Sequence, residues 1–234
     1  MKLFILTIKN EQLINQLNGL EGEAMTSHLN NNVAIIVLAA GQSSRLGQMK
    51  QLITIKEKSL VEWQLEQALK VSSKVYCVLG FNASEVKARI DHLPINTIIN
   101  KKFSGGMGSS IAAGVAALTA DIKAVMIVLV DQWQLTEKDL IRHQNFWQES
   151  PNAIVVAQDT NMAAAVNSAK IGPPVIFSQH YFADLTQLTG TQGAKPLLEK
   201  YQDNLLKVPL AHAFFDIDTP EQLNDMYKKL GIKT

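Results

Sequence analysis

From Val33 onward, short runs rich in valine, isoleucine and leucine alternate with segments of helical period. This alternation is typical of βα units, which build a mostly parallel sheet. The expected strands cover residues 33–40, 74–80, 95–99, 123–130 and 153–157, and the expected helices cover residues 59–70, 83–91, 109–120 and 136–148. The pattern therefore predicts the α/β class, as a single-domain, Rossmann-like three-layer α/β/α sandwich.

The run AVMIVLV, residues 124–130, is predicted to lie near the middle of that sheet, because a strand covered on both faces is apolar at consecutive positions. After about residue 158 the pattern changes to a loop, a strand PVIF, two short helices and a closing strand AFFDID, residues 213–218. The segment TPEQLNDMYKKL then predicts a last helix, with Thr219 as its N-cap and Pro220 at its first position.

Composition limits the class of protein. The chain has 234 residues, 47% hydrophobic and 18% charged, so we expect one globular domain over residues 31–234 and an N-terminal extension over residues 1–30. The net charge of +1 is scattered, which argues against a nucleic-acid partner. Apolar stretches stay below the ~20 residues that cross a bilayer, so no membrane partner is expected. The single cysteine, Cys77, fits a reducing compartment, and we expect a cytoplasmic protein.

The stretch LAAGQSSRLG, residues 38–47, follows the first expected strand. Ligands bind at the carboxyl ends of the strands in a parallel sheet. The small residues would let the backbone approach an anion, while Arg45 and Lys50 would supply positive charge. The alternative is a glycine-containing turn with two solvated cations, and spacing alone leaves both open. The Walker A and G-x-G-x-x-G patterns are absent.

Carboxylates follow two other segments. Asp131 ends the apolar central strand and so reaches the same edge of the sheet as the first loop. In FFDIDTP, strand alternation would place Asp216 and Asp218 on one side. A turn or helix-capping role stays open for each of these residues. GGMGSS, residues 105–110, is either a flexible turn with a serine cap or a place where backbone approaches a ligand closely.

The stretch LAAGQSSRLGQMKQL resembles the signature of nucleotidyltransferases that include the molybdenum cofactor cytidylyltransferases, the molybdopterin-guanine dinucleotide synthases and the methylerythritol phosphate cytidylyltransferases. VLGFNASEV, GGMGSSIAAGVAAL, VMIVLVDQ, GPPVIF, LTGTQGAK and FDIDTPEQL follow in the order of the molybdenum cofactor cytidylyltransferase branch of the MobA-like group, over roughly residues 33–227. The resemblance implies a fold of the nucleotide-diphospho-sugar transferase type. It also implies a Mg²⁺-dependent transfer of CMP from CTP to a phosphorylated acceptor, molybdopterin, with release of pyrophosphate.

The resemblance implies roles for individual residues as well. Asp131 and Asp218 would hold Mg²⁺, with Asp216 nearby. The catalytic residues would be Arg45, Lys50 and Asp131. The residues expected to bind the nucleotide are Leu38, Ala39, Ala40, Gly41, Gln42, Ser43, Gly105, Gly106, Ser109 and Ser110. The residues expected to contact the acceptor are Gln132, Gly172 and Lys195.

Some positions depart from the family pattern. Trp133 stands where proline is common, and Thr191 stands where an acidic residue is usual. Lys195 replaces the usual arginine, and residues 158–171 offer only Lys170 for gripping a pterin phosphate. These departures concern the acceptor side and leave the donor side unchanged.

Other functions stay open at this point. Within the same class, the alternatives are a GTP-using molybdopterin guanylyltransferase and a sugar-phosphate nucleotidyltransferase. From other classes, the alternatives are an NADPH-dependent oxidoreductase and a non-catalytic protein that binds a nucleotide or cofactor for a partner enzyme. A molybdoenzyme or its maturation chaperone is the protein partner that the resemblance implies.

Overall fold

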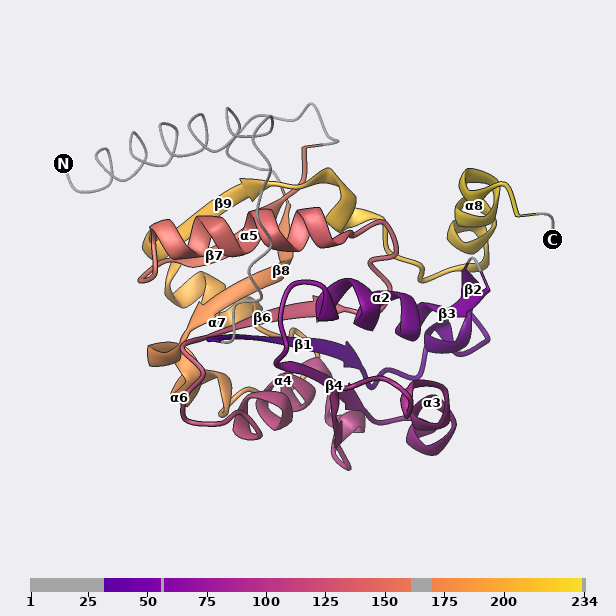
Figure 1. Cartoon of the computed structure of the whole chain (residues 1–234), viewed down its shortest axis with the longest axis horizontal. Coiled ribbons are helices and arrows are strands. Elements are labelled where there is room, and N and C mark those ends of the chain that lie inside the picture. Colours follow the sequence, from indigo (N-terminus) through magenta and orange to yellow (C-terminus); the bar gives the residue numbers. More distant parts are fainter. Residues whose placement is uncertain (1–31, 56, 161–169, 233–234) are drawn as a thin grey trace.

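The computed structural model describes residues 32–55, 57–160 and 170–232, so the expected N-terminal extension lies outside the described residues. The described residues form a central seven-stranded sheet with helices on both faces (Figure 1). The strands of this sheet are β1 (Val33–Ala39), β4 (Val75–Leu79), β5 (Asn96–Ile99), β6 (Ala124–Leu129), β7 (Ile154–Gln158), β8 (Ile171–Ser178) and β9 (Leu205–Pro209). A separate two-stranded sheet consists of β2 (Thr54–Ile55) and β3 (Lys58–Ser59).

Helices connect most of these strands. The α-helices are α2 (Leu60–Leu69), α3 (Ala83–Ile90), α4 (Met107–Ala116), α5 (Glu137–Glu149), α6 (Phe182–Leu185), α7 (Lys195–Lys200) and α8 (Pro220–Leu230). Short 3-10 helices occur at Lys50–Leu52, Phe103–Gly105, Gln179–Tyr181, Gln202–Asn204 and Ala211–Phe214. In the described part of the chain, none of the helices has the length and apolar character that crossing a membrane requires.

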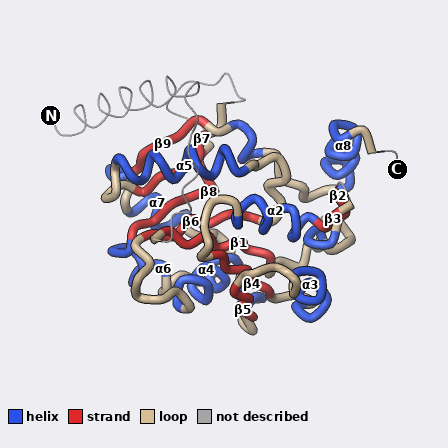
Figure 2. The backbone as a smooth tube through the Cα atoms, in the orientation of Figure 1, coloured by secondary structure: helices blue, strands red, loops and turns tan. Residues whose placement is uncertain are grey.

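The strand order is β5-β4-β1-β6-β8-β7-β9. Strand β1 pairs in parallel with β4 and β6, β4 pairs in parallel with β5, and β7 pairs in parallel with β9. Strand β8 runs antiparallel to both of its neighbours, β6 and β7. The predicted mostly parallel, Rossmann-like sheet is therefore confirmed, and so is the central place of β6, the fourth of seven strands (Figure 2).

Two hydrophobic cores make the three layers. Side chains of β1 alternate between them, because successive residues of a strand point to opposite faces. Val33, Ile35 and Val37 belong to the core that α2, α3, α5 and α8 cover. Ala34 and Ile36 belong to the core on the other face, under α4, α6 and α7. Because both cores are buried, β1 is apolar at every position, as the sequence indicated.

Local signals fix where the helices begin. Helix α2 starts after Ser59, whose hydroxyl accepts from the Glu62 backbone N–H while the Glu62 carboxylate accepts from the Ser59 N–H. Helix α8 starts after Thr219 in the same reciprocal arrangement with Gln222, and Pro220 is its first residue. The N-cap predicted at Thr219 and the first helical position predicted for Pro220 are confirmed, and Ser59 caps α2 in the same way.

The closing strand expected at residues 213–218 is wrong. Residues Ala211–Phe214 form a 3-10 helix, and residues 215–218 form no regular element. The strand of this region is β9, which lies earlier in the chain and pairs with β7 at the sheet edge. The carbonyl of Ala213 accepts a hydrogen bond from the Gln132 side chain, so its partner is a side chain and not a neighbouring strand.

Candidate active site

The sheet topology brings two loops together. Strands β1 and β6 are adjacent and parallel, so their carboxyl ends lie at the same edge. The chain leaves β1 toward β4 on one side and later returns through β6 on the other, which makes this edge a topological switch point. Ligands of open α/β sheets bind at such a point. The loop after β1 and Asp131, which follows β6, both lie there.

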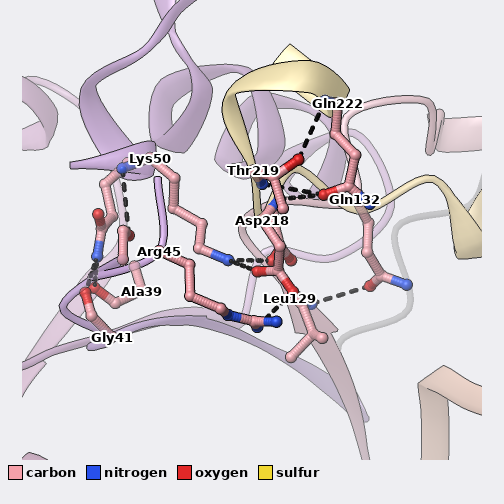
Figure 3. Close-up of polar contacts among 12 residues, drawn as sticks. Ala39, Gly41, Arg45, Lys50, Leu129, Gln132, Asp218, Thr219 and Gln222 are labelled. Carbon is pink, nitrogen blue, oxygen red and sulfur yellow. Dashed lines mark hydrogen bonds and ion pairs between the residues drawn. The ribbon is translucent and has the colours of Figure 1, made fainter. Parts of the chain in front are cut away.

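A buried glutamine supports the first loop. The Gln51 Nε2 atom donates to the carbonyls of Ala39, at 2.9 Å, and Gly41, at 2.7 Å (Figure 3). The Gln51 side chain is buried, while Gly41 and Gln42 are exposed. The Ser43 hydroxyl oxygen accepts from the Lys50 backbone N–H at 3.3 Å. The Gln51 amide, which the sequence reasoning missed, therefore fixes the backbone of a loop whose residues Gly41 and Gln42 are exposed.

Four charged side chains meet beside this loop: Arg45, Lys50, Asp131 and Asp218. The Lys50 Nζ atom lies 2.5 Å from Asp131 Oδ2 and 2.9 Å from Asp218 Oδ1. Arg45 donates from Nη2 to Asp218 Oδ2 at 2.7 Å (Figure 3). The side chains of Lys50 and Asp131 are only 14% and 10% exposed. Asp131 and Asp218 come from distant segments, yet both carboxylates lie within hydrogen-bonding distance of one nitrogen atom.

The cluster shifts the pKa values of its members. Burial would lower the pKa of Lys50, but the charges and hydrogen bonds of Asp131 and Asp218 raise it above its ordinary value. Burial would raise the pKa of Asp218, but Lys50 and then Arg45 hold it below its ordinary value. Burial, followed by the negative charge of Asp131, raises the pKa of Asp216 to about 6. The site is therefore dense in negative charge that two cations offset.

The donor set at this cluster fits a hard divalent cation. The Asp131 Oδ1 atom is buried and has no hydrogen-bond partner among the described residues, so one carboxylate oxygen is left for another ligand. Over residues 32–55, 57–160 and 170–232, no group of three or more histidine, cysteine or acidic residues is arranged to hold a metal alone. Mg²⁺ commonly binds to one or two carboxylates together with substrate phosphates and water. Asp131 and Asp218 match that pattern.

The two glycine-containing motifs pack against each other. Gly106 has φ of +98°, and a Cβ atom there would lie 2.4 Å from the carbonyl oxygen of Gly190. A Cβ atom on Gly108 would lie 2.4 Å from the carbonyl oxygen of Thr189, and the Gly108 N–H donates to Gly190 at 2.9 Å. The segment LTGTQGAK therefore supports the loop GGMGSS, and the glycines are needed for this close backbone contact.

Asn100, another residue that the sequence reasoning missed, holds the two serines of that loop. Its Nδ2 atom donates to the hydroxyl of Ser109 at 2.9 Å and to that of Ser110 at 3.0 Å. The Ser109 hydroxyl in turn lies 2.8 Å from the carbonyl oxygen of Gly106. The structure thus places both serines at the start of α4 and engages their hydroxyls within the protein. Gly105 is exposed beside them.

Two of the residues expected to contact the acceptor, Gln132 and Gly172, lie near each other, because Gln132 bonds the carbonyl of Pro173, the residue after Gly172. Gln132 is 1% exposed, and its side-chain amide is bonded to backbone groups, so its side chain presents no free polar group to an acceptor. Gly172 lies on β8, where a Cβ atom would approach the Phe214 ring at 3.7 Å. Lys195 begins α7, and its Nζ atom lies 3.8 Å from Glu199 Oε1 of the same helix.

Comparison with known proteins identifies the family of this chain. Residues 35–205 match the model of the MobA-like NTP transferase domain. The purine catabolism protein PucB of Bacillus subtilis is 28% identical over 214 residues, which cover 83% of this chain and 95% of that protein. The molybdenum cofactor cytidylyltransferase of Escherichia coli is 30% identical over 87 residues, 37% of this chain and 45% of the enzyme. The nicotine blue oxidoreductase of Paenarthrobacter nicotinovorans is 39% identical over 99 residues, 42% of this chain and 48% of that protein.

Solved structures share the fold. A Mycobacterium tuberculosis protein crystallised with manganese matches with a TM-score of 0.69 and 20% identity, over 85% of this chain and 99% of that one. The molybdopterin-guanine dinucleotide biosynthesis protein A of Archaeoglobus fulgidus matches with a TM-score of 0.65 and 17% identity, over 85% and 98%. The family match covers most of the chain and contains the first loop and Asp131. The chain belongs to the MobA-like NTP transferase family and is a nucleotidyltransferase.

Proposed function

We propose that this nucleotidyltransferase moves CMP from CTP to a phosphorylated acceptor, molybdopterin, with Mg²⁺ bound by Asp131 and Asp218 and with release of pyrophosphate. The observation that carries the proposal is the meeting of these two carboxylates on one Lys50 nitrogen, at 2.5 Å and 2.9 Å, beside the loop after β1. The unpartnered Oδ1 atom of Asp131 supports it.

The reaction explains why such a cluster is needed. Bringing a phosphate monoester to a triphosphate places several negative charges side by side. Each uncompensated pair about 4 Å apart costs roughly 4 kcal/mol at an effective dielectric near 20. Mg²⁺ bound at the two aspartates would offset part of that repulsion and stabilise charge on the α-phosphoryl oxygens. Arg45 and Lys50 are the protein's own cations at this point.

The bond changes balance without a general base. A phosphate oxygen of the acceptor bonds to the α-phosphorus of CTP, and the bond from that phosphorus to the bridging β-phosphate oxygen breaks. The electron pair of the broken bond leaves with pyrophosphate. Lys50 and Arg45 would orient the phosphates and stabilise the charge that develops on the leaving group. The exposed backbone of Gly41 and Gln42 would approach the phosphates of the nucleotide.

The names of related proteins bear on the identity of the nucleotide donor. The Escherichia coli relative is named a cytidylyltransferase, which favours CTP. The Archaeoglobus fulgidus neighbour is named for a guanine dinucleotide, so GTP is the alternative donor. The relative named nicotine blue oxidoreductase keeps NADPH oxidation as a second candidate, although this chain lacks the dinucleotide fingerprint.

A nucleotide panel tests the donor first. Melting temperatures measured with CTP, GTP, ATP, UTP and NADPH, each with and without Mg²⁺, should rise most with CTP and Mg²⁺ together, because a ligand of the native state stabilises it by mass action. Pyrophosphate release should then require CTP, Mg²⁺ and molybdopterin at once. A larger rise in melting temperature with GTP than with CTP would identify GTP as the donor. A shift with NADPH alone would favour the oxidoreductase.

A further inference from the structure

Gln132 is almost completely buried next to the carboxylate cluster. It follows Asp131 directly in the chain and is 1% exposed. Its Nε2 atom donates to the carbonyl of Pro173 at 2.7 Å and to that of Ala213 at 2.8 Å. Its Oε1 atom accepts from the Leu129 N–H at 3.0 Å (Figure 3). Both ends of this amide are therefore used by backbone groups.

These three bonds join three segments that are far apart in the chain. Leu129 is the last residue of β6, Pro173 lies in β8, and Ala213 lies in the 3-10 helix that leads to Asp218. Residues 215–218 form no helix or strand, and the segment is held by burial of Ile217 in the core, by the bond from the Asp218 N–H to Gln222 and by the bond from Gln132 to Ala213. Gln132 thus ties the segment that carries one carboxylate to the strand end that carries the other.

We propose that Gln132 is a positioning residue that sets the spacing of Asp131 and Asp218, and so the affinity of the site for a divalent cation. The inference rests on the proposed function, because it takes these two aspartates as the metal ligands. Gln132 does not touch the metal or the substrate in this account. It holds the backbone of the segments that carry Asp131 and Asp218. Hydrogen bonds that orient metal ligands in this way affect the affinity for the metal.

The chemistry of the side chain explains why glutamine is suited to this place. A primary amide offers two N–H donors and a carbonyl acceptor on one rigid plane. Pro173 and Ala213 supply two acceptors, and Leu129 supplies one donor. A methionine of similar length would fill the volume but leave all three backbone groups without a partner. The segment before Asp218 would then lose its hydrogen bond to the end of β6.

A matched pair of variants tests the proposal. Gln67 is also buried, and its Oε1 atom accepts from the backbone N–H of Glu137 at 3.1 Å, which ties α2 to α5. Gln132→Met and Gln67→Met both remove a buried amide. Binding of Mn²⁺ alone is measured by electron paramagnetic resonance, and stability is measured by urea unfolding in the absence of metal. We expect Gln132→Met to weaken Mn²⁺ binding about 10- to 100-fold, the range for outer-shell partners, and Gln67→Met to leave it unchanged.

The outcomes separate this inference from the proposed function. Failure of the wild-type chain to bind Mn²⁺ would overturn the proposed metal site, and this inference with it. Binding by wild type and by Gln132→Met with equal affinity would overturn the positioning role alone. Equal weakening in both variants would also overturn it, because the effect would then follow from lost stability. If Gln132→Met does not fold, Gln132→Glu, which keeps the volume and the acceptor for Leu129, is judged by the same criteria.

Discussion

Lys50 and Asp131 form a 2.5 Å ion pair at the sheet edge where the carboxyl ends of β1 and β6 meet. The same Lys50 nitrogen lies 2.9 Å from Asp218, so one ammonium compensates two carboxylates. All three groups are partly or largely shielded from water, which strengthens their interactions relative to a surface pair. In the absence of a metal ion, the position of Asp218 relative to Asp131 therefore depends on this lysine.

Lys50→Met tests that dependence. Removing the ammonium leaves two carboxylates facing each other, and we expect the free energy of unfolding to fall by about 1–3 kcal/mol in metal-free buffer. Because Mn²⁺ would compensate the same charge, it should stabilise the variant more than the wild type. Lys58→Met, which removes a more exposed pair with Glu66, should change stability by less than about 1 kcal/mol. A Lys50→Met protein as stable as wild type and indifferent to Mn²⁺ would contradict this account.

Neighbouring glycines give a second prediction. An alanine at Gly106 must adopt a positive φ and place its Cβ 2.4 Å from a backbone oxygen of Gly190. We expect Gly106→Ala to lower the free energy of unfolding by roughly 1–3 kcal/mol and to reduce the thermal shift that CTP with Mg²⁺ produces. At Gly105 a Cβ would meet nothing within 4 Å, so Gly105→Ala should be close to neutral. Equal stability of the two variants would show that the contact with Gly190 is dispensable.

The pH dependence of stability should report His143. This imidazole is fully buried on α5, and burial lowers its pKa to about 3. Below pH 6.5, the ordinary pKa of this imidazole, the unfolded chain binds a proton that the folded chain does not. The free energy of unfolding therefore falls as the pH falls from 6.5 toward 3. His143 should lower the free energy of unfolding by up to about 1.4 kcal/mol for each pH unit between pH 6 and pH 4. Urea unfolding at several pH values gives the free energy of unfolding as a function of pH. For His143→Gln this pH dependence should be weaker by that amount. An unchanged pH dependence would count against the prediction.

The elements that could be predicted from sequence were those with a local signal. The sequences of β1 and β6 are apolar at consecutive positions because helices cover both faces of the sheet. Such an apolar run can be recognised from the sequence alone. The position of Asp131 at the carboxyl end of β6 could be predicted as well, because this residue directly follows such a run. The capping residues Ser59 and Thr219 were predictable for the same reason, because a cap acts within a few residues.

The segment around Asp216 could not be predicted in the same way. FFDID alternates as a strand does, but Gln132 bonds Ala213 and Ile217 is buried in the core, and such contacts between distant residues leave no local pattern. The supporting roles of Gln51 and Asn100 were missed for that reason too. Glutamine and asparagine in a sequence give no sign of whether their amides face water or buried carbonyls.

Pyrophosphate release by Asp131→Asn shows whether the Asp131 carboxylate is needed for nucleotidyl transfer. With CTP, Mg²⁺ and molybdopterin present, loss of one carboxylate charge should cut the rate by at least ~10²-fold, the scale seen when a group that stabilises transition-state charge is removed. Asp121→Asn provides the control, because Asp121 is 57% exposed and precedes β6, at the opposite end of that strand from Asp131. We expect a wild-type rate for Asp121→Asn and near loss of activity for Asp131→Asn. A wild-type rate for Asp131→Asn would show that this carboxylate does not take part in the reaction.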